Sequence, residues 1–407
     1  MKIIADLHIH SKYSRATSKD MDIPTLSKWA KIKGINLLGT GDSTHPEWEK
    51  EIKMYLKEKN DGIYEYDGTN FIISGEVALI FSQGGKTRRV HLSLLIKKIE
   101  DMEKINKTLS KFSDLSIDGR PVLPLSCSEF VKIVLDLAED TFIYPAHAWT
   151  PWFGIFGSET GFDSLEEAFQ DEIKNIYAIE TGLSSDPPMN HLISKLDKIT
   201  LLSNSDAHSP SNIGREANVF ECDLKYNEII EAIKKRDKSR FLFTIEFFPE
   251  EGKYHYDGHR NCGVSLSPEE SIKLNNICPV CKRPLTLGVL HRVYELKDRD
   301  NFNEKDFIPF VNLIPLMEII SQALQKNKSS KLVEDEYMKM IQKFGNEMNI
   351  LFFLPLNEML GRVDERIFKL IKNMREGKVK KKPGFDGEYG VIEVIEDFEK
   401  ETPPSLF

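Results

Sequence analysis

Two pairs of metal-binding side chains at the same spacing are the most informative chemical feature of this sequence. His8 and His10 end an apolar run that starts at Lys2, and Asp206 and His208 end a second such run. Side chains at positions i and i+2 of a strand project from the same face, about 7 Å apart. Each pair can therefore hold one cation, or two neighbouring cations, without rearrangement of a loop.

Further imidazole and carboxylate groups follow other strand-like runs between the two pairs. With the pairs themselves, the candidates are His8, His10, Asp42, His45, Glu76, His91, His147, Asp206 and His208. These groups suit Zn, Mn or Fe, and a shared carboxylate such as Glu76 can bridge two ions. A single histidine is more often structural, but repeated placement at strand ends favours one common metal site.

A cluster of divalent ions favours hydrolysis of a phosphate ester. Bound ions lower the pKa of a water molecule bound to them to about 7, and they neutralise charge on the attacking and leaving oxygens. Arginines near the motifs are candidates for a bidentate phosphate clamp, although each could equally be an ordinary solvated side chain. These candidates are Arg15, Arg88, Arg89 and Arg215.

A second set of metal ligands lies further along the chain. His259 and Cys262 are separated by two residues, as are Cys278 and Cys281, and fifteen residues lie between the two pairs. Four ligands of this kind with no vacancy describe a structural tetrahedral zinc. His255 is the alternative to His259 as the fourth ligand.

Short apolar strands alternate with amphipathic helices from residue 1 to about residue 245. The pattern predicts a first strand at 2–7 and a helix near 25–33. Further strands are predicted at 36–39, 71–74, 89–92, 141–144, 178–180 and 241–244. The alternation favours parallel strands wrapped by helices, in a barrel or a doubly wound sheet. We expect a distorted barrel, because candidate ligands repeatedly follow strand ends, where barrel active sites are built.

The remainder of the chain changes character twice. Clustered His, Cys, Gly and Pro after residue 248 indicate a small metal-held module. Apolar periodicity then predicts a mainly helical part, with helices at 307–324, 332–343 and 366–374. A chain of 407 residues is long enough for two or three domains. The expected division is 1–248, 249–298 and 299–407.

The motifs of the first part resemble those of the polymerase and histidinol phosphatase (PHP) family. The matching segments are Asp6–Ser11, Gly75–Glu76, His91, His147 and Ser205–His208. The resemblance implies an α/β fold, a distorted seven-stranded barrel that holds two or three divalent ions (Zn, Mg or Mn) at the carboxyl ends of its strands. The ligands that it implies are His8, His10, Asp42, Glu76, His91, His147, Asp206 and His208, of which Asp206, Glu76 and His147 are expected to be catalytic.

Two positions depart from the usual pattern of the PHP family. Where many members have Thr-Asp-His, this chain reads Gly41-Asp42-Ser43-Thr44-His45. That ligand is therefore Asp42 or His45, and we favour Asp42. No match to a further acidic or histidine ligand is found at 12–17, which leaves occupancy of the third metal position open.

Nearly the whole chain resembles endonuclease Q, in which a PHP barrel is joined to a zinc module and a helical C-terminal region. The segments that carry this are Asp6–Thr17, Gly39–Asp42, Gly252–Cys262, Cys278–Cys281 and Gly288–Val293. The resemblance implies a repair enzyme that uses metal-activated water to cut double-stranded DNA 5′ to a deaminated base (uracil, hypoxanthine or xanthine) or an abasic site. Some members bind the sliding clamp, but the tail Thr402–Phe407 lacks the expected Gln and paired aromatic residues.

Side chains suited to nucleic acid lie in and beside these segments. Those of the zinc module mix aromatic and cationic groups, as expected of a surface that contacts phosphates and stacked bases. They are Tyr254, His255, Tyr256, Arg260, Lys282, Arg283, His291 and Arg292. The segment Trp149–Phe153 follows His147 and is either an aromatic wall around an extruded base or a packed loop. Weak pairing of a damaged base lowers the cost of flipping it out.

Two other functions compete with DNA repair. A small-molecule phosphatase of the histidinol phosphate type would use the same ligands and be indifferent to mutation of Cys278 or Cys281. The other alternative is a nucleic-acid-binding scaffold without catalytic activity. The nearly complete set of metal ligands argues against it. The net charge of −9 argues mildly against indiscriminate binding of polyanions.

The composition of the chain also indicates the cellular compartment in which we expect the protein. No apolar run approaches the roughly 18 to 20 residues of a membrane span. The sequence enters a strand without a basic segment followed by an apolar one, so secretion is not expected. Five cysteines, an odd number, suit a reducing compartment better than a disulfide framework. We therefore expect a cytoplasmic protein.

Overall fold

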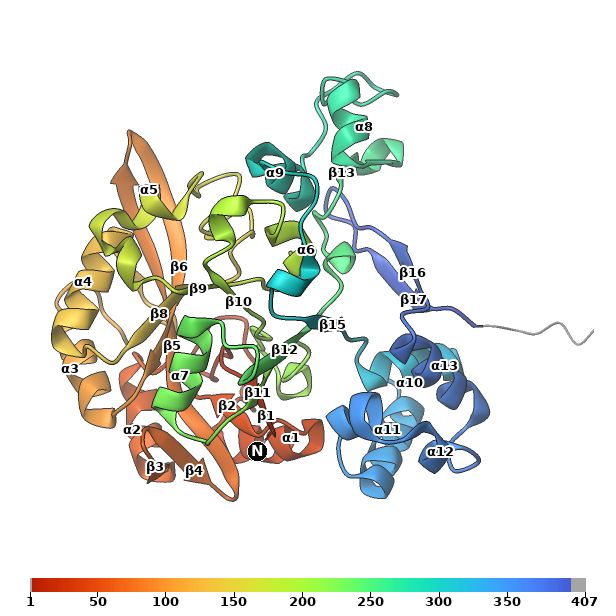
Figure 1. Cartoon of the computed structure of the whole chain (residues 1–407), viewed down its shortest axis with the longest axis horizontal. Coiled ribbons are helices and arrows are strands. Elements are labelled where there is room, and N and C mark those ends of the chain that lie inside the picture. The colour runs from red at the N-terminus through yellow and green to blue at the C-terminus, as the bar shows by residue number, and fades with distance from the viewer. Residues whose placement is uncertain (1, 397–407) are drawn as a thin grey trace, which may run out of the picture. The chain divides into compact units, whose positions relative to one another are not determined.

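The computed structural model describes residues 2–396 (Figure 1). It separates into two compact units, one within 1–313 and 383–390 and the other within 314–382 and 391–407. The division predicted at residues 248 and 298 stays a prediction. Among the described residues, every helix is too short or too polar to cross a membrane.

The first unit is built on a mixed sheet. Its strands are β1 (Lys2–Asp6), β2 (Leu37–Gly39), β3 (Lys57–Asn60), β4 (Ile63–Tyr66), β5 (Thr69–Gln83), β6 (Lys86–Ile96), β7 (Val122–Leu123), β8 (Phe142–Pro145), β11 (Ala217–Glu221), β12 (Phe241–Glu246) and β15 (Phe310–Asn312). Their order is β15-β12-β11-β1-β2-β5-β4-β3, with β6 and β7 paired to β5 and β8 paired to β6. A separate parallel pair consists of β9 (Ala178–Glu180) and β10 (Thr200–Leu202).

The expectation of parallel strands is correct for only part of this sheet. β2 is parallel to both β1 and β5. β6, however, is antiparallel to both β5 and β8, and β11 is antiparallel to β1. β5 and β6 form one long hairpin around Gly84 and Gly85, a pair of residues typical of tight hairpin turns, so no crossover helix lies between them. The fold is mixed α/β, and strand pairing within 2–396 does not by itself close a seven-stranded barrel.

Helices surround this framework. They are α1 (Ile23–Lys33), α2 (Pro46–Tyr55), α3 (Ile99–Leu109), α4 (Cys127–Leu137), α5 (Leu165–Phe169), α6 (Pro187–Asn190) and α7 (Tyr226–Lys235). α1 begins where the Asp22 carboxylate accepts the Thr25 N–H at 2.8 Å. It ends at Gly34, which has the left-handed conformation that closes many helices.

One apolar core holds the strands and α7 together. Ile3, Leu7 and Leu37, from the β1 and β2 region, are fully buried. They pack in the same cluster as Ile229 and Ile233, which lie four residues apart and so share one face of α7. This core fixes the strands whose carboxyl ends carry the candidate ligands.

The zinc-module segment also belongs to the first unit. It contains β13 (Asp257–His259), β14 (Val264–Leu266), α8 (Pro268–Lys273) and α9 (Val289–Leu296). Residues 383–390 pack against it: the Tyr256 N–H donates to the Gly384 carbonyl at 2.9 Å and the Gly387 N–H to the Lys253 carbonyl at 3.0 Å. A segment near the end of the chain therefore completes this module.

The second unit is mainly helical. It comprises α10 (Leu316–Leu324), α11 (Lys331–Phe344), a π-helical turn (Asn349–Phe353), α12 (Leu356–Met359), α13 (Glu365–Arg375), β16 (Val379–Lys382) and β17 (Val391–Val394). The helix predicted from residue 307 is wrong over its first part. Pro315 precedes α10, and the residues before it form β15, which pairs with β12.

Candidate metal centres

The two ligand pairs found in the sequence lie side by side in the fold. The chain continues beyond β1 through His8 and His10, next to the segment that follows β10. The N–H of Asp206 donates to the carbonyl of His8, and the N–H of His10 donates to the carbonyl of Ala207, both at 3.0 Å. Backbone pairing thus brings together two motifs that are two hundred residues apart.

Seven of the predicted ligands form one continuous cluster. Their nitrogen and oxygen atoms converge within 4.8 Å in three groups, which are His8, His10 and Glu76; His10, Asp206 and His208; and Glu76, His91 and His147. The groups overlap because His10 and Glu76 each belong to two of them. The three groups therefore form one connected set of donor atoms that could hold metal ions.

Glu76 lies at the middle of the cluster. Its Oε2 atom is 3.3 Å from Nε2 of His10. Its Oε1 atom is 2.8 Å from Nδ1 of His91 and 3.0 Å from Nε2 of His147. One carboxylate therefore faces two sets of imidazoles, and it could be shared by two ions if both were bound.

Unsatisfied buried atoms in the cluster match divalent ions. Nε2 of His8, Nε2 of His10 and Oδ1 of Asp206 are buried and have no hydrogen-bond partner within the described chain. The Asp206 oxygen lies 3.9 Å and 3.0 Å from the two nitrogens, but they are not aligned for hydrogen bonding. Orphaned buried polar atoms are costly. Cations between these imidazole and carboxylate groups would satisfy all three, so the residues fit a divalent metal centre.

Two buried carboxylates lie beside the Nδ1 atoms of His8 and His10, on the side of each ring opposite its free Nε2 atom. Nδ1 of His8 is 3.0 Å from Oε2 of Glu180, and Nδ1 of His10 is 3.0 Å from Oδ1 of Asp42. A carboxylate on the second ring nitrogen fixes the orientation of a metal-binding imidazole and raises its basicity. Asp42 lies outside the three ligand groups, and its other oxygen accepts the N–H and hydroxyl of Ser11 at 2.7 and 2.6 Å.

Glu180 is a site residue that was not predicted from the sequence. It is fully buried at the end of β9, a strand that the sequence pattern does predict. A carboxylate at the carboxyl end of a predicted strand is the signal that could have identified it. His45, the alternative to Asp42, lies apart from the cluster: its Nδ1 atom caps α2 by accepting the N–H of Glu47 at 3.3 Å.

Three residues at the cluster have a strained backbone. Asp42, His147 and Asp206 have φ angles of 45°, 29° and 47°. Residues other than glycine rarely adopt this left-handed backbone conformation. Gly182, whose φ is 61°, packs against His147, and a Cβ atom there would lie 2.7 Å from the Cβ of His147. Strain of this kind is typical of functional sites, where the surrounding structure holds it in place.

Arg120 is a second site residue that was not predicted. Its guanidinium NH1 lies 3.1 Å from Oε2 of Glu76. Burial would raise the pKa of Glu76, but His91, Arg120 and His8 outweigh burial and hold that pKa well below its ordinary value. Glu76 is therefore an anion at neutral pH, and Arg120 adds a fixed positive charge beside it.

The four arginines proposed from the sequence have other partners. Arg15 pairs with Asp118 at 3.2 Å, Arg88 pairs with Glu167 at 2.8 Å, Arg89 lies 6.0 Å from the ring of Phe153, and the Nε of Arg215 donates to the carbonyl of Ser205 at 3.0 Å. Sequence proximity to a motif was the only basis for choosing them. It is a poor guide to which guanidinium faces the cluster.

The zinc-module residues form a separate group of four ligands. The atoms of His259, Cys262, Cys278 and Cys281 converge within 4.8 Å, and Nδ1 of His259 is 3.5 Å from Sγ of Cys281. Burial would raise the pKa of the Cys278 thiol, but the N–H groups of Cys281 and Val280 help to lower it. This stabilises the thiolate that zinc requires. His255 lies outside the group, beside the ring of Tyr256.

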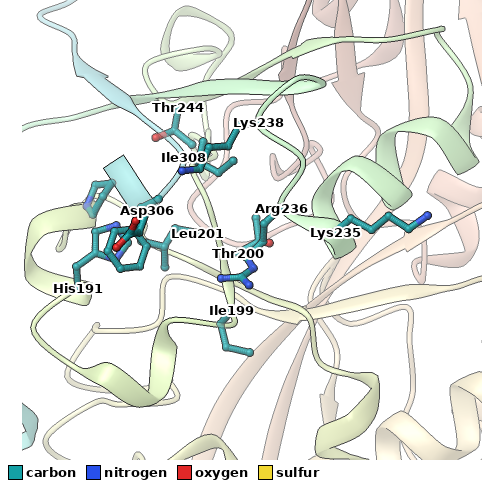
Figure 2. A pocket seen from close by; sticks show the side chains of 12 residues that line it. His191, Ile199, Thr200, Leu201, Lys235, Arg236, Lys238, Thr244, Asp306 and Ile308 are labelled. Carbon is teal, nitrogen blue, oxygen red and sulfur yellow. The ribbon is translucent and has the colours of Figure 1, made fainter. Parts of the chain in front are cut away.

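A cavity of about 130 Å³ lies elsewhere in the first unit (Figure 2). The ring of His191 stacks on that of Phe307 at its edge, with 3.6 Å between centroids. Two cations at the cavity are already engaged, since Arg236 donates to the carbonyl of Asp197 and Lys238 to that of Lys305. Lys235 points away from the other labelled side chains. The lining includes none of the metal-group residues.

Comparison with families and sequences gives partial matches and one full-length relative. Residues 315–378 match the family described as MJ0043 C-terminal domain, and residues 197–237 match that described as PHP-associated. Uncharacterized protein MJ0043 of Methanocaldococcus jannaschii is 35% identical over 60% of this chain, which spans only 31% of that relative's length. Uncharacterized protein YqxK of Bacillus subtilis is 28% identical over 96% of this chain and 99% of its own.

Two solved structures match over the full length. The lesion-specific endonuclease PfuEndoQ from Pyrococcus furiosus is 36% identical, with a TM-score of 0.88, and the match covers 100% of this chain and 98% of that one. Endonuclease Q in complex with a 27-mer duplex substrate, which has an abasic lesion at the active site, is also 36% identical. Its TM-score is 0.86, and the match covers 100% of both chains.

Proposed function

Because the chain belongs to the endonuclease Q family, we propose that it cuts duplex DNA on the 5′ side of a deaminated base or an abasic site. The carrying observation is the continuous cluster around Glu76, in which the buried Nε2 atoms of His8 and His10 have no hydrogen-bond partner within 2–396. A metal-dependent phosphodiesterase requires such convergent donors. Among the similar proteins, one is described as lesion-specific and another was crystallised with an abasic duplex.

The cluster divides into residues that bind ions and residues that orient them. The proposed ligands are His8, His10, Glu76, His91, His147, Asp206 and His208. Two or three divalent ions, Zn, Mg or Mn, would activate water and neutralise charge on a phosphate diester. Asp42 and Glu180 keep His10 and His8 in the required orientation.

Arg120 is proposed to bind the scissile phosphate. It is the cation that directs an N–H to Glu76, and an arginine has five such donors in a rigid planar fork. One donor holds Glu76, and the guanidinium has further N–H groups that could bind a phosphate oxygen. A guanidinium in this position would orient the phosphate and stabilise the additional negative charge of the transition state.

The finer architecture is also a proposal. A distorted seven-stranded barrel at 1–248, a zinc module at 249–298 and a helical domain at 299–407 follow the division expected from sequence. Closure of the barrel is supported by the hydrogen bond from Ala148 N–H to the Glu180 carbonyl, at 2.9 Å, which links the segment after β8 to β9. One structural zinc bound by His259, Cys262, Cys278 and Cys281 would hold the module.

The proposed substrate is a duplex that contains uracil, hypoxanthine, xanthine or an abasic site. Such positions pair weakly, which lowers the cost of turning the nucleotide out of the stack, a cost of roughly a few kcal/mol for a normal pair. Cys127, Cys222, Cys262, Cys278 and Cys281 form no disulfide with one another, which suits the proposed reducing, cytoplasmic compartment. The sliding clamp is not proposed as a partner, and the tail considered for it lies outside the described residues.

The test compares lesion cutting with simple phosphatase activity. End-labelled duplexes with uracil, hypoxanthine, an abasic site or no lesion are incubated with Mg²⁺ or Mn²⁺ and with wild-type protein or Asp206→Ala. We expect a single cut 5′ to each lesion, an intact control duplex, and a loss of at least about 100-fold in the variant. If lesion duplexes stay intact while a phosphate monoester is hydrolysed, the protein is instead a small-molecule phosphatase.

A further inference from the structure

The loop that follows the predicted ligand His147 is rich in large aromatic residues. Three of them are core residues: Trp149, Phe156 and Phe162 are 1%, 2% and 1% exposed. The indole Nε1 of Trp149 donates to Asn190 at 2.8 Å, as expected of a buried tryptophan. Packing alone therefore explains much of the aromatic content of this loop.

Trp152 differs from these neighbours because it is 51% exposed. Phe153, beside it, is partly buried, whereas about half of the Trp152 side chain is exposed to solvent. Packing does not account for an aromatic side chain of this size at this position. The same residue is only five positions from His147. Trp152 therefore presents an exposed indole ring at a position close in sequence to a residue of the metal cluster.

One side of this loop is fixed to the strand that carries His91. The N–H of His91 donates to the carbonyl of Phe153 at 2.9 Å, and Phe153 forms a bridge with Val90. The rings of His91 and Phe153 lie 4.3 Å apart. Phe153 has a left-handed φ of 68°, so the backbone turns sharply directly after Trp152.

The other side of the loop is held by Arg292 of α9. Its Nε atom donates to the carbonyl of Phe156 at 3.1 Å, and its NH2 atom donates to the carbonyl of Phe162 at 3.2 Å. The loop is thus anchored both to β6 and to the zinc-module helix. An anchored loop loses little conformational entropy when its exposed ring engages a ligand.

We propose that Trp152 stacks on the base of the lesion nucleotide and so contributes to the selection of base lesions. This inference rests on the proposed function. A nucleobase offers a flat π-face whatever its hydrogen-bonding edge, so one indole can accept uracil, hypoxanthine and xanthine alike. An abasic nucleotide has no base to stack, and its cutting should depend little on Trp152.

The experiment uses this difference between substrates. Single-turnover cutting of uracil, hypoxanthine and abasic duplexes is measured for wild type, Trp152→Ala and Trp152→Phe. We expect Trp152→Ala to slow cutting at the two base lesions by about tenfold or more, and to change abasic cutting by less than about threefold. Trp152→Phe, which keeps an aromatic face, should restore most of the rate at base lesions.

Matched controls separate stacking from damage to the fold. Phe112→Ala removes another exposed aromatic ring, 40% exposed, and should leave all rates unchanged. The thermal midpoint and bound metal of Trp152→Ala should equal those of wild type. Equal losses on abasic and base lesions, or no loss on either, would overturn the stacking role while leaving the proposed function intact. Failure of the wild type to cut every lesion duplex would instead overturn the proposed function.

Discussion

Nδ1 of His8 lies 3.0 Å from Oε2 of Glu180, and Nε2 of the same ring faces Glu76 at 3.6 Å. The imidazole is thus held by one carboxylate and directed toward another. Glu180 also accepts the N–H of His147 at 3.1 Å and the side-chain amide of Asn204 at 3.0 Å. A single buried carboxylate that is not itself in a ligand group therefore positions two of the proposed ligands.

Glu180→Gln should weaken metal binding without removing a ligand. The amide keeps the size of the side chain but loses the charge that increases the basicity of His8, and such losses cost about 10- to 100-fold in metal affinity. Titration with Mn²⁺, followed by calorimetry and by cutting of a uracil duplex, measures the change. Glu221→Gln alters an exposed glutamate at the end of β11 and serves as the control. Equal Mn²⁺ affinity in the two variants would show that Glu180 does not tune the site.

Arg120→Gln should reduce kcat/KM for a lesion duplex by about 10- to 100-fold, because a fixed cation would no longer meet the phosphate. Arg120→Lys keeps the charge but not the planar fork, and an intermediate loss is expected. Bound metal is measured in each variant, so that a loss of ions is not mistaken for a loss of phosphate contact. The control is Arg15→Gln, since the Arg15 side chain is 77% exposed. The phosphate role is wrong if Arg120→Gln cuts as fast as this control.

The sequence was a good guide to the convergence of candidate ligands that lie beside one another in the chain. His8 with His10 and Asp206 with His208 are short-range patterns, and strand periodicity alone puts each pair on one face. Glu180 and Arg120 carry no such pattern. Their roles depend on which tertiary partner each meets, and that choice is made by packing of segments far apart in the chain.

The fold was predictable to a similar extent. Each strand predicted from an apolar run has a counterpart in the structure, but several strands, among them β3, β4 and β11, were not predicted. Strand direction depended on the connections between strands. The β5 and β6 hairpin was missed because the alternation of strands and helices elsewhere favoured parallel pairing, although Gly84-Gly85 is a hairpin signal. The start of α10 was misplaced because apolar periodicity continues through β15, which is a strand that pairs with β12.

Removal of one zinc-module ligand should affect both stability and DNA cutting. Cys281→Ser should lower bound zinc by one ion per chain, because the remaining three ligands do not complete a tetrahedral site. The free energy of zinc binding is then lost from folding of the module, so the thermal midpoint should fall and lesion cutting with it. Elemental analysis and a thermal scan measure this, with Cys222→Ser as the control for loss of a thiol. Unchanged zinc content in Cys281→Ser would contradict the assignment.

Stability should depend on pH through Glu246, which lies outside the metal cluster. Burial raises the pKa of Glu246 from 4.5 to about 8, against hydrogen bonds from Thr244 and Thr181 that lower it. Because the folded pKa is the higher one, the folded state binds more protons than the unfolded chain between these values. The stabilisation is complete below about pH 4.5 and is lost as the pH rises through about 8.

Glu246→Gln imitates the protonated side chain at every pH. The thermal midpoint of the variant should therefore change less between pH 5 and pH 8.5 than that of wild type, with a difference of at least roughly 2 °C at the upper end. Thermal scans across this range provide the measurement, and Glu221→Gln should follow wild type. A variant whose midpoint falls as steeply as that of wild type would show that Glu246 does not titrate in this window.

Anomalous diffraction from crystals soaked in Mn²⁺ would show whether these imidazoles and carboxylates hold several cations. We expect at least two peaks within about 2.0–2.3 Å of the nitrogen and oxygen atoms around Glu76, and their disappearance in Asp206→Ala crystals or a marked fall in their height. Wild-type crystals with no peak among His8, Glu76 and Asp206 would contradict this expectation.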